Sequence, residues 1–194
     1  MLTLYAATGN PAKLAEFQAA AAAVGLRLEP VPGFASLPPC VEDGVTFEEN
    51  ALKKAVHYNR GAGELVFADD SGLEVAGLGG APGVFSARYA GPGATDVQNN
   101  LKLLRELESL PATARSARFV CVIALARRGQ VLATFEGHVD GVVAPAPAGR
   151  GGFGYDPLFL LPELGRTFAE VAPQEKLRYS HRGRAFRALL GWIS

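Results

Sequence analysis

Residues 117–143, which read ARFVCVIALARRGQVLATFEGHVDGVV, decide the fold class. Two apolar runs, Ala117 to Ala126 and Val131 to Val143, are joined through Arg128-Gly129-Gln130. A short polar connection with a glycine between two such runs is typical of a tight turn between antiparallel strands. The segment therefore predicts a long β-hairpin.

Short strands alternate with helices in the half of the chain before this hairpin. Apolar runs at 3–7, 26–31 and 64–68 predict three strands, and the third is expected to end at 69–72. Helices are predicted after Asn10, which precedes Pro11, and after capping-box motifs that begin at Thr46 and Thr95. Such alternation favours parallel strands, whereas the hairpin adds antiparallel ones. We therefore expect an α/β fold with a mixed sheet.

Two of the predicted helices have apolar residues at helical spacing. The helix after Thr95 is expected to bury one face, and the last helix, from near Ser180, another. These faces comprise Val97, Leu101, Leu104 and Leu107 in the first helix, and Phe186, Leu189, Leu190 and Ile193 in the second. Between the two helices, after the hairpin, a glycine-rich turn at 149–154 precedes a predicted strand at 158–161.

The composition limits the class of protein. Lys plus Arg and Asp plus Glu number 19 each among 194 residues, so no global basic field attracts nucleic acid. No apolar segment approaches 18 residues, and we therefore expect a cytoplasmic protein that does not enter membranes. Cys40 and Cys121 lack metal-ligand spacing and are expected to be reduced, structural thiols. With no linker, a single domain over 1–194 is expected.

The first candidate for chemistry is the strand-to-helix turn Thr8-Gly9-Asn10-Pro11-Ala12-Lys13. Free backbone amides and the positive end of the helix dipole meet there, and Lys13 adds a full charge. Such a turn suits a phosphate group, although a capped helix with a surface lysine would have the same sequence. A Walker A loop is excluded because the chain has no Gly-Lys dipeptide.

The second candidate is Asp69-Asp70-Ser71-Gly72, at the end of an apolar run. Adjacent carboxylates at a strand end suit Mg²⁺, which binds one or two carboxylates and completes its shell with water and substrate phosphate. Successive strand residues point to opposite faces, so only one of the pair is expected to face a cleft. An Asp-rich turn is the alternative. Glu42 is a possible second ligand, unless it only complements a helix dipole, and Glu49 is expected to pair with Lys53 on the helix surface.

Two further segments could bind a nucleotide. In the glycine-rich turn, Phe153 or Tyr155 offers a flat face for a base and Asp156 offers an acceptor, although an aromatic corner packed on the core fits equally well. The only dense basic patch runs from Lys176 to Arg187. Its cations oppose the dipole at a helix N-terminus, which favours an anionic or carbonyl-rich partner, and a solvated basic face is the alternative.

Six blocks, in order, resemble the inosine triphosphate pyrophosphatase family, also called the Ham1 type. One departure is Leu177, where relatives often carry a small polar residue. The blocks are Thr8-Gly9-Asn10 with Lys13, Glu49-Asn50-Ala51 with Lys54-Ala55, Asp69-Asp70-Ser71-Gly72-Leu73, Gly80-Ala81-Pro82-Gly83 through Ser86-Ala87-Arg88-Tyr89, Gly152-Phe153-Gly154-Tyr155-Asp156-Pro157, and Ser180-His181-Arg182.

The resemblance implies an α/β fold with two lobes around a long mixed sheet, flanking helices and a central cleft, and it implies a homodimer. It also implies Mg²⁺-dependent hydrolysis of deaminated purine nucleoside triphosphates (ITP, dITP and XTP) to the monophosphate and pyrophosphate. By position, Asp70 would be the base on water, and Glu42 and Asp70 would bind the metal. Substrate contacts would come from Thr8, Gly9, Asn10, Ala12, Lys13, Ser71, Phe153, Gly154, Tyr155, Asp156, Lys176, His181 and Arg182.

Hydrogen-bond donors from Arg182 or backbone amides, aimed at a 6-oxo group, would reject adenine, because its amino group would face another donor. Two other functions stay open at this point. One is a Maf-like pyrophosphatase for modified nucleotides, and the other is a nucleotide-binding module without turnover.

Overall fold

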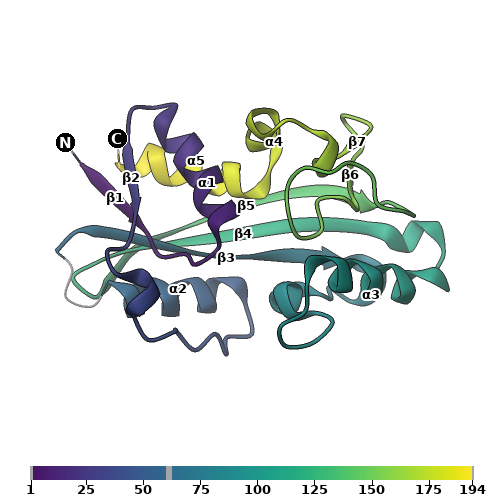
Figure 1. Ribbon diagram of the computed structural model, residues 1–194, viewed down its shortest axis with the longest axis horizontal. Coiled ribbons are helices and arrows are strands. Elements are labelled where there is room, and N and C mark those ends of the chain that lie inside the picture. Colours follow the sequence, from purple (N-terminus) through teal and green to yellow (C-terminus); the bar gives the residue numbers. More distant parts are fainter. Residues whose placement is uncertain (1, 60–62, 194) are drawn as a thin grey trace. The chain divides into compact units, whose positions relative to one another are not determined.

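The computed structural model describes residues 2–59 and 63–193. Helices and strands alternate along the first half of the chain, and β4 and β5 form the long predicted pair (Figure 1). The strands are β1 Thr3–Ala6, β2 Arg27–Pro30, β3 Leu65–Val75, β4 Ser116–Arg127, β5 Gln130–Val143, β6 Phe159–Leu161 and β7 Arg166–Thr167. The α-helices are α1 Pro11–Ala22, α2 Phe47–Tyr58, α3 Asp96–Glu108, α4 Pro173–Tyr179 and α5 His181–Ile193. Short 3₁₀ helices are η1 Phe34–Ser36, η2 Ala76–Leu78, η3 Gly83–Arg88, η4 Ala112–Arg115 and η5 Phe168–Glu170.

The strands form one mixed sheet in the order β2-β1-β3-β4-β5-β6-β7. β1 pairs in parallel with β2 and β3, whereas β6 pairs antiparallel with both β5 and β7. The turn between β4 and β5 places Arg128 and Gly129 at φ values of 53° and 74°, the left-handed region that two-residue hairpin turns need. The predicted α/β class, mixed sheet and hairpin are therefore confirmed.

The chain forms two compact units. Unit 1 comprises Met1–Asp70, Cys121–Gly137 and His181–Ser194, and unit 2 comprises Ser71–Val120 and His138–Ser180. β3, β4 and β5 each contribute residues to both units.

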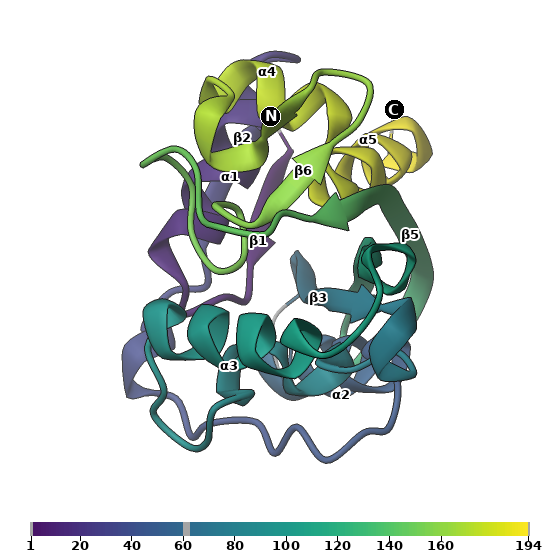
Figure 2. The ribbon, with the colours of Figure 1, turned by 90° about the vertical axis from the view of Figure 1, so that its right-hand side faces the viewer.

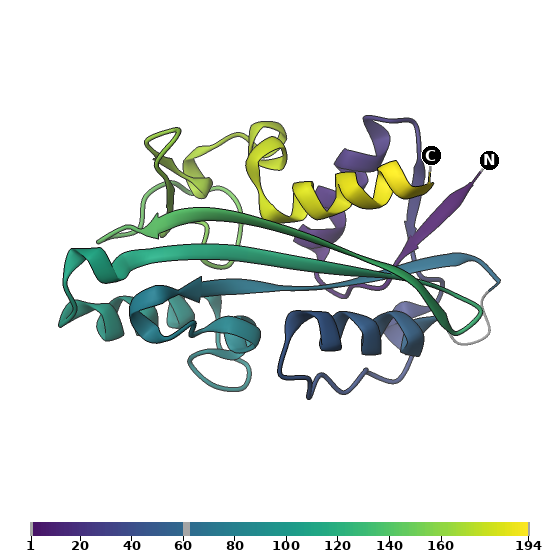
Figure 3. The ribbon, with the colours of Figure 1, turned by 180° about the vertical axis from the view of Figure 1, so that it is seen from behind.

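In unit 1, helices cover both faces of the strands. α1 and α5 lie on one face and α2 on the other (Figures 1 and 3). Phe17 of α1 packs against Phe67 of β3 and Phe186 of α5, with ring centroids 4.9 and 5.1 Å apart. Burial of these aromatic rings fixes α1 and α5 against the strand that leads into Asp69 and Asp70.

Unit 2 has its own apolar core. Figure 2 shows α3 and α4 on opposite sides of this unit. Its buried members come from β3, α3, β4, β5, β6 and the segments around them. They include Leu73, Val75, Leu103, Leu107, Phe119, Val139, Leu158, Phe159 and Phe168. No helix among the described residues has the length and apolar character needed to cross a membrane.

Three local predictions were wrong. The strand predicted for 64–68 does not end at the aspartates but continues to Val75. Buried residues lie both before and after Asp69-Asp70, so the strand stays in the core on both sides of the pair. The predicted apolar face of α3 is also wrong in part. Leu107 is buried as expected, but Val97 and Leu101 are exposed, and Leu103, which the prediction left out, is buried. Ile193 of α5 is only half-buried.

A further error concerns the C-terminal basic segment. Residues 173–179 form α4, which begins with Pro173 and which the sequence did not reveal. Lys176 therefore lies in α4, whereas His181 and Arg182 open α5.

Candidate active site

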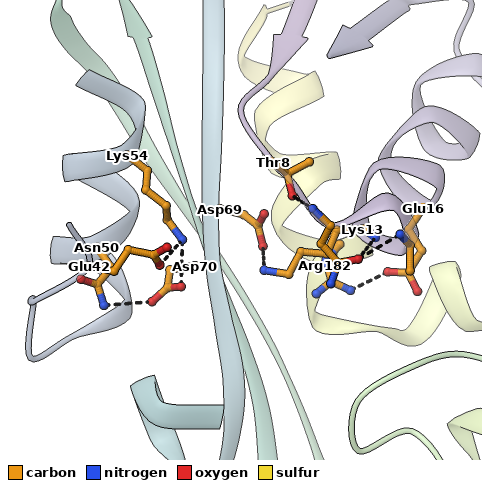
Figure 4. A network of polar contacts seen from close by, with 11 residues as sticks. Thr8, Lys13, Glu16, Glu42, Asn50, Lys54, Asp69, Asp70 and Arg182 are labelled. Carbon is orange, nitrogen blue, oxygen red and sulfur yellow. Dashed lines mark hydrogen bonds and ion pairs between the residues drawn. The ribbon is translucent and has the colours of Figure 1, made fainter. Parts of the chain in front are cut away.

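The aspartates of β3 lie in regular strand and point to opposite faces of it (Figure 4). Asp69 lies on the side of Lys13 and Arg182, and Asp70 lies on the side of α2. Both are buried, with exposed fractions of 3% and 8%. The predicted alternation is confirmed, and the alternative of an Asp-rich turn is excluded.

Asp69 is surrounded by fixed cations. Its Oδ2 lies 2.7 Å from Lys13 Nζ, and the buried Arg182 adds a second positive charge. Although burial raises the pKa of a carboxyl group, Lys13, Arg182 and then Lys54 outweigh it and lower the pKa of Asp69 to about 2. Asp69 is therefore a permanent anion that holds Lys13 in place.

Asp70 is in a different electrostatic environment. Lys54 Nζ lies 3.0 Å from its Oδ1, and Asn50 Nδ2 donates to its Oδ2 at 3.2 Å. Burial nevertheless raises the pKa of Asp70, and the nearby carboxylate of Glu42 adds to the rise. Asp70 is thus a carboxylate whose proton affinity is above that of an ordinary aspartate, which suits a base.

Helix α2 supplies the partners of Asp70. Thr46 caps this helix by accepting from the Glu49 amide, and Asn50 and Lys54, four residues apart, share its buried face. Asn50 Oδ1 also accepts from the Gly44 amide at 2.8 Å, which ties the loop that carries Glu42 to the same helix. A Cβ on Gly44 would lie 2.6 Å from that oxygen, so the close approach requires glycine.

Of the two adjacent lysines, only Lys54 reaches the aspartates of β3. Lys53 Nζ lies 2.5 Å from Asp43 at the surface, and Glu49 accepts from the Val45 amide. The predicted pairing of Glu49 with Lys53 is therefore replaced by these two contacts. The carboxylates of Asp70, Asp69 and Glu42 outweigh the effect of burial and raise the pKa of Lys54, which stays charged.

Glu42 and Asp70 converge on one cation, the ammonium group of Lys54, at 2.8 and 3.0 Å. Two carboxylates directed at a common point fit a Mg²⁺ ion, which takes hard oxygen ligands and keeps several waters. No group of three His, Cys, Asp or Glu side chains within 2–59 and 63–193 could hold a metal ion. The donor set thus fits an ion that is held jointly with a substrate, rather than in a cage of protein ligands.

The turn before α1 is capped by its own side chains. Asn10 Oδ1 accepts from the amides of Ala12 and Lys13 at 2.9 and 3.1 Å, and Thr8 Oγ1 accepts from the Asn10 amide. The predicted helix cap is confirmed, but the expectation of free amides is wrong for these three groups. What remains for an anion is the charge of Lys13, the dipole of α1 and the side chains of the turn.

The start of α5 is buried against β5. His181 and Arg182 are 3% and 2% exposed, and Arg182 Nη1 lies 2.5 Å from Glu16 Oε2 of α1. A Cβ on Gly137 would lie 2.2 Å from the His181 carbonyl oxygen, so glycine lets the helix approach the strand. The alternative of a solvated basic face is therefore wrong for these two residues, although Arg178, Arg184 and Arg187 are exposed.

In unit 2, the segment 152–156 folds around Asp156. The Phe153 amide donates to Asp156 Oδ2 at 2.9 Å, and Lys176 Nζ lies 2.5 Å from the same oxygen. Lys176 also sits 4.9 Å from the centre of the Phe153 ring. A Cβ on Gly152 would lie 2.0 Å from Asp156 Oδ2, so the turn is tightly packed at this residue.

The two aromatic candidates of this segment differ. Tyr155 is buried in the core of unit 2, and its hydroxyl donates to the Ser86 carbonyl at 2.9 Å. Its ring is the aromatic corner that was the alternative for this segment. Phe153 is only half-buried, so it is the better candidate platform for a purine.

The predicted residues thus form two groups. Asn50 and Lys54 belong to one of the six blocks but were assigned no role, although their spacing of four after a helix cap was a usable signal. Glu16 was missed, because the sequence holds no signal for it. Unit 1 contains Thr8, Gly9, Asn10, Ala12, Lys13, Glu42, Asp70, His181 and Arg182, and unit 2 contains Ser71, Phe153, Gly154, Tyr155, Asp156 and Lys176.

Comparisons with known proteins agree on one family. The model of the Ham1 family matches residues 4–192. A dITP/XTP pyrophosphatase of Thermus thermophilus is 52% identical over 95% of this chain and 88% of its own length, and one of Geobacillus kaustophilus is 48% identical over 97% and 93%. Among solved structures, a HAM1 protein from Coxiella burnetii superposes with a TM-score of 0.88 at 44% identity, covering 100% of this chain and 98% of that one.

Proposed function

Because this chain belongs to the Ham1 family, we propose that it hydrolyses the deaminated purine nucleotides ITP, dITP and XTP to the monophosphate and pyrophosphate. Relatives that are about half identical over nearly the whole chain are dITP/XTP pyrophosphatases, and the six sequence blocks resemble the same family. The activity would remove damaged purines from the nucleotide pool.

We propose Asp70 as the base. Its buried carboxylate, with a raised pKa and two hydrogen-bond donors, is the single observation that carries this assignment. Asp70 Oδ1 or Oδ2 would take the proton of the attacking water while Lys54 compensates the charge on the carboxylate. Glu42 and Asp70 would hold Mg²⁺, which when bound lowers the pKa of water and neutralises phosphate charge.

The remaining predicted residues bind substrate in this proposal. Lys13 and the Thr8–Ala12 turn would contact the phosphates, and Ser71, which follows Asp70, would lie beside the substrate. The Phe153 ring would stack on the purine, with Asp156 and Lys176 at its edge. His181 and Arg182 would donate hydrogen bonds to the 6-oxo group. The amino group of adenine is itself a donor and cannot accept these hydrogen bonds.

A panel of nucleotides tests the function. Purified protein with Mg²⁺ is expected to release pyrophosphate from ITP, dITP and XTP far faster than from ATP or GTP. Preference for a methylated or modified pyrimidine nucleotide would favour the Maf-like alternative, and binding without product would favour a non-catalytic module. Hydrolysis in ¹⁸O-water, followed by mass spectrometry of both products, identifies the phosphorus that is attacked.

We also propose that the protein is a homodimer with a single catalytic domain that acts in the cytoplasm. Light scattering across a concentration series would give the mass of the assembly, and a mass of 20.4 kDa throughout would contradict the dimer.

A further inference from the structure

Helix α3 binds both backbone polar groups of one residue, Gly154, in the segment around Asp156. Asp96 Oδ2 accepts from the Gly154 amide at 2.6 Å, and Asn100 Nδ2 donates to the Gly154 carbonyl at 3.0 Å. Asp96 and Asn100 are four residues apart, so both side chains stand on one face of the helix. The amide and the carbonyl of a single residue are thus bound by one rigid element.

The buried face of α3 is polar at its start and apolar further along, where Leu103 and Leu107 lie. Asn99 and Asn100 are 3% and 8% exposed, whereas Val97 and Leu101 of the same turns are 66% and 47% exposed. Burying an amide costs free energy unless it forms hydrogen bonds. Asn99 forms them with the Ala90 amide and the Ala87 carbonyl, and Asn100 Nδ2 forms one with Gly154, whereas Asn100 Oδ1 has no hydrogen-bond partner among the described residues. The start of α3 therefore packs through hydrogen bonds of buried asparagines rather than through apolar side chains.

Gly154 is the residue of this segment that needs such a restraint. Its φ of 61° lies in the left-handed region, and a Cβ there would meet no atom within 4 Å. Glycine loses more conformational freedom on folding than any other residue. Since Gly154 directly follows Phe153 and precedes Asp156 by two residues, its orientation sets the direction of the Phe153 ring and of the Asp156 carboxylate.

We infer that Asp96 and Asn100 are positioning residues for purine recognition, and this inference rests on the proposed function of Phe153 and Asp156. They act through Gly154: by fixing both polar groups of this residue, they hold the proposed base platform in its binding geometry before a nucleotide arrives. Preorganisation of this kind lowers the ordering cost of binding. The loss of Asp96 or Asn100 would therefore weaken discrimination between purine bases more than it would slow the chemical step.

Kinetics of four variants test the inference. Asp96→Ala and Asn100→Ala are expected to raise KM for ITP about tenfold, to leave kcat within about threefold, and to narrow the preference for ITP over GTP. Asp96→Asn keeps an oxygen acceptor and should recover most of the loss. Val97→Ala, an exposed change in the same helical turn, is the matched control and should behave as wild type.

A second readout is independent of turnover. Hydrogen exchange of the Gly154 amide, followed by NMR on the full chain, should accelerate in Asp96→Ala while exchange elsewhere and the Tm stay near wild type. Wild-type KM, preference and Gly154 exchange in both alanine variants would overturn the inference. A wild-type protein that hydrolyses no nucleotide would instead overturn the proposed function, and the Gly154 exchange would still decide whether α3 fixes this segment.

Discussion

Asp69 and Asp70 are chemically identical neighbours in β3, yet the structure gives them opposite electrostatic environments. Asp69 lies on the side of Lys13 and Arg182, and its pKa falls to about 2. Asp70 faces Lys54 but also Glu42, and burial raises its pKa. The comparison teaches that strand alternation alone, by sending two side chains to two faces, can separate a structural counterion from a reactive carboxylate.

The largest expected effect belongs to Asp70→Asn. Removing the proposed base should lower kcat for ITP by about 10³-fold. Because burial raises the pKa of Asp70, its ionisation costs stability, which offsets the loss of one carboxylate partner of Lys54, and the Tm should change little. Steady-state kinetics and calorimetry on the same preparation check both statements. An active variant, or one whose Tm falls by several degrees, would erase the proposed contrast with Asp69.

Asp69→Asn, unlike Asp70→Asn, should lower the free energy of unfolding. A carboxyl group with a pKa of about 2 instead of 3.8 contributes about 2 kcal/mol above pH 5, which is about 4–8 °C in Tm for a chain of this size. The sign follows from the lowered pKa. The contribution is complete above the unfolded value and is lost as pH falls through about 2. Urea unfolding of both proteins between pH 7 and 2.5 should show a difference that shrinks at the acidic end.

Lys54→Met sharpens the Asp70 side of the comparison. Without the ammonium group, Asp70 and Glu42 repel each other, so the pKa of Asp70 should rise further and the acidic limb of the kcat profile should move to higher pH. We expect a loss in kcat of about 100-fold. Lys53→Met removes only the surface pair with Asp43 and serves as the matched control. An unshifted pH profile would contradict the proposal that Lys54 lowers the pKa of Asp70.

The smallest effect concerns the metal. Since Glu42 and Asp70 share the charge of Lys54 and the described residues hold no third ligand of the usual kind, Mg²⁺ alone should bind on the order of 1 mM. At 1 mM it would then raise the Tm by only about 1–2 °C. Thermal scans with Mg²⁺, with IMP, and with both together measure this. A large shift with Mg²⁺ alone would mean that further ligands complete the site.

Local chemistry made several elements predictable. Asn10 before Pro11, the capping box at Thr95 and the Arg128-Gly129 turn each satisfy backbone groups within a few residues, so their structures follow from neighbouring side chains alone. The resemblance in turn located the candidate residues along the chain.

Two of the errors share one cause, which is that distant partners decided the outcome. Asp69 and Asp70 have good turn chemistry, but cations from α1, α2 and α5 make it possible to bury them in a strand. Val97 and Leu101 have helical spacing, but the start of α3 directs Asp96 and Asn100 toward the distant Gly154, which they bind, and this leaves Val97 and Leu101 exposed.

The sequence by itself determined the alternation of strands and helices, the caps, the hairpin and the set of residues that carry charge. Only the tertiary structure decided which carboxylate is a fixed anion and which has a raised pKa, and which of Lys53 and Lys54 faces them. The physical reason is that a pKa depends on burial and on charges within a few ångströms, and those neighbours come from segments that the chain order does not bring together.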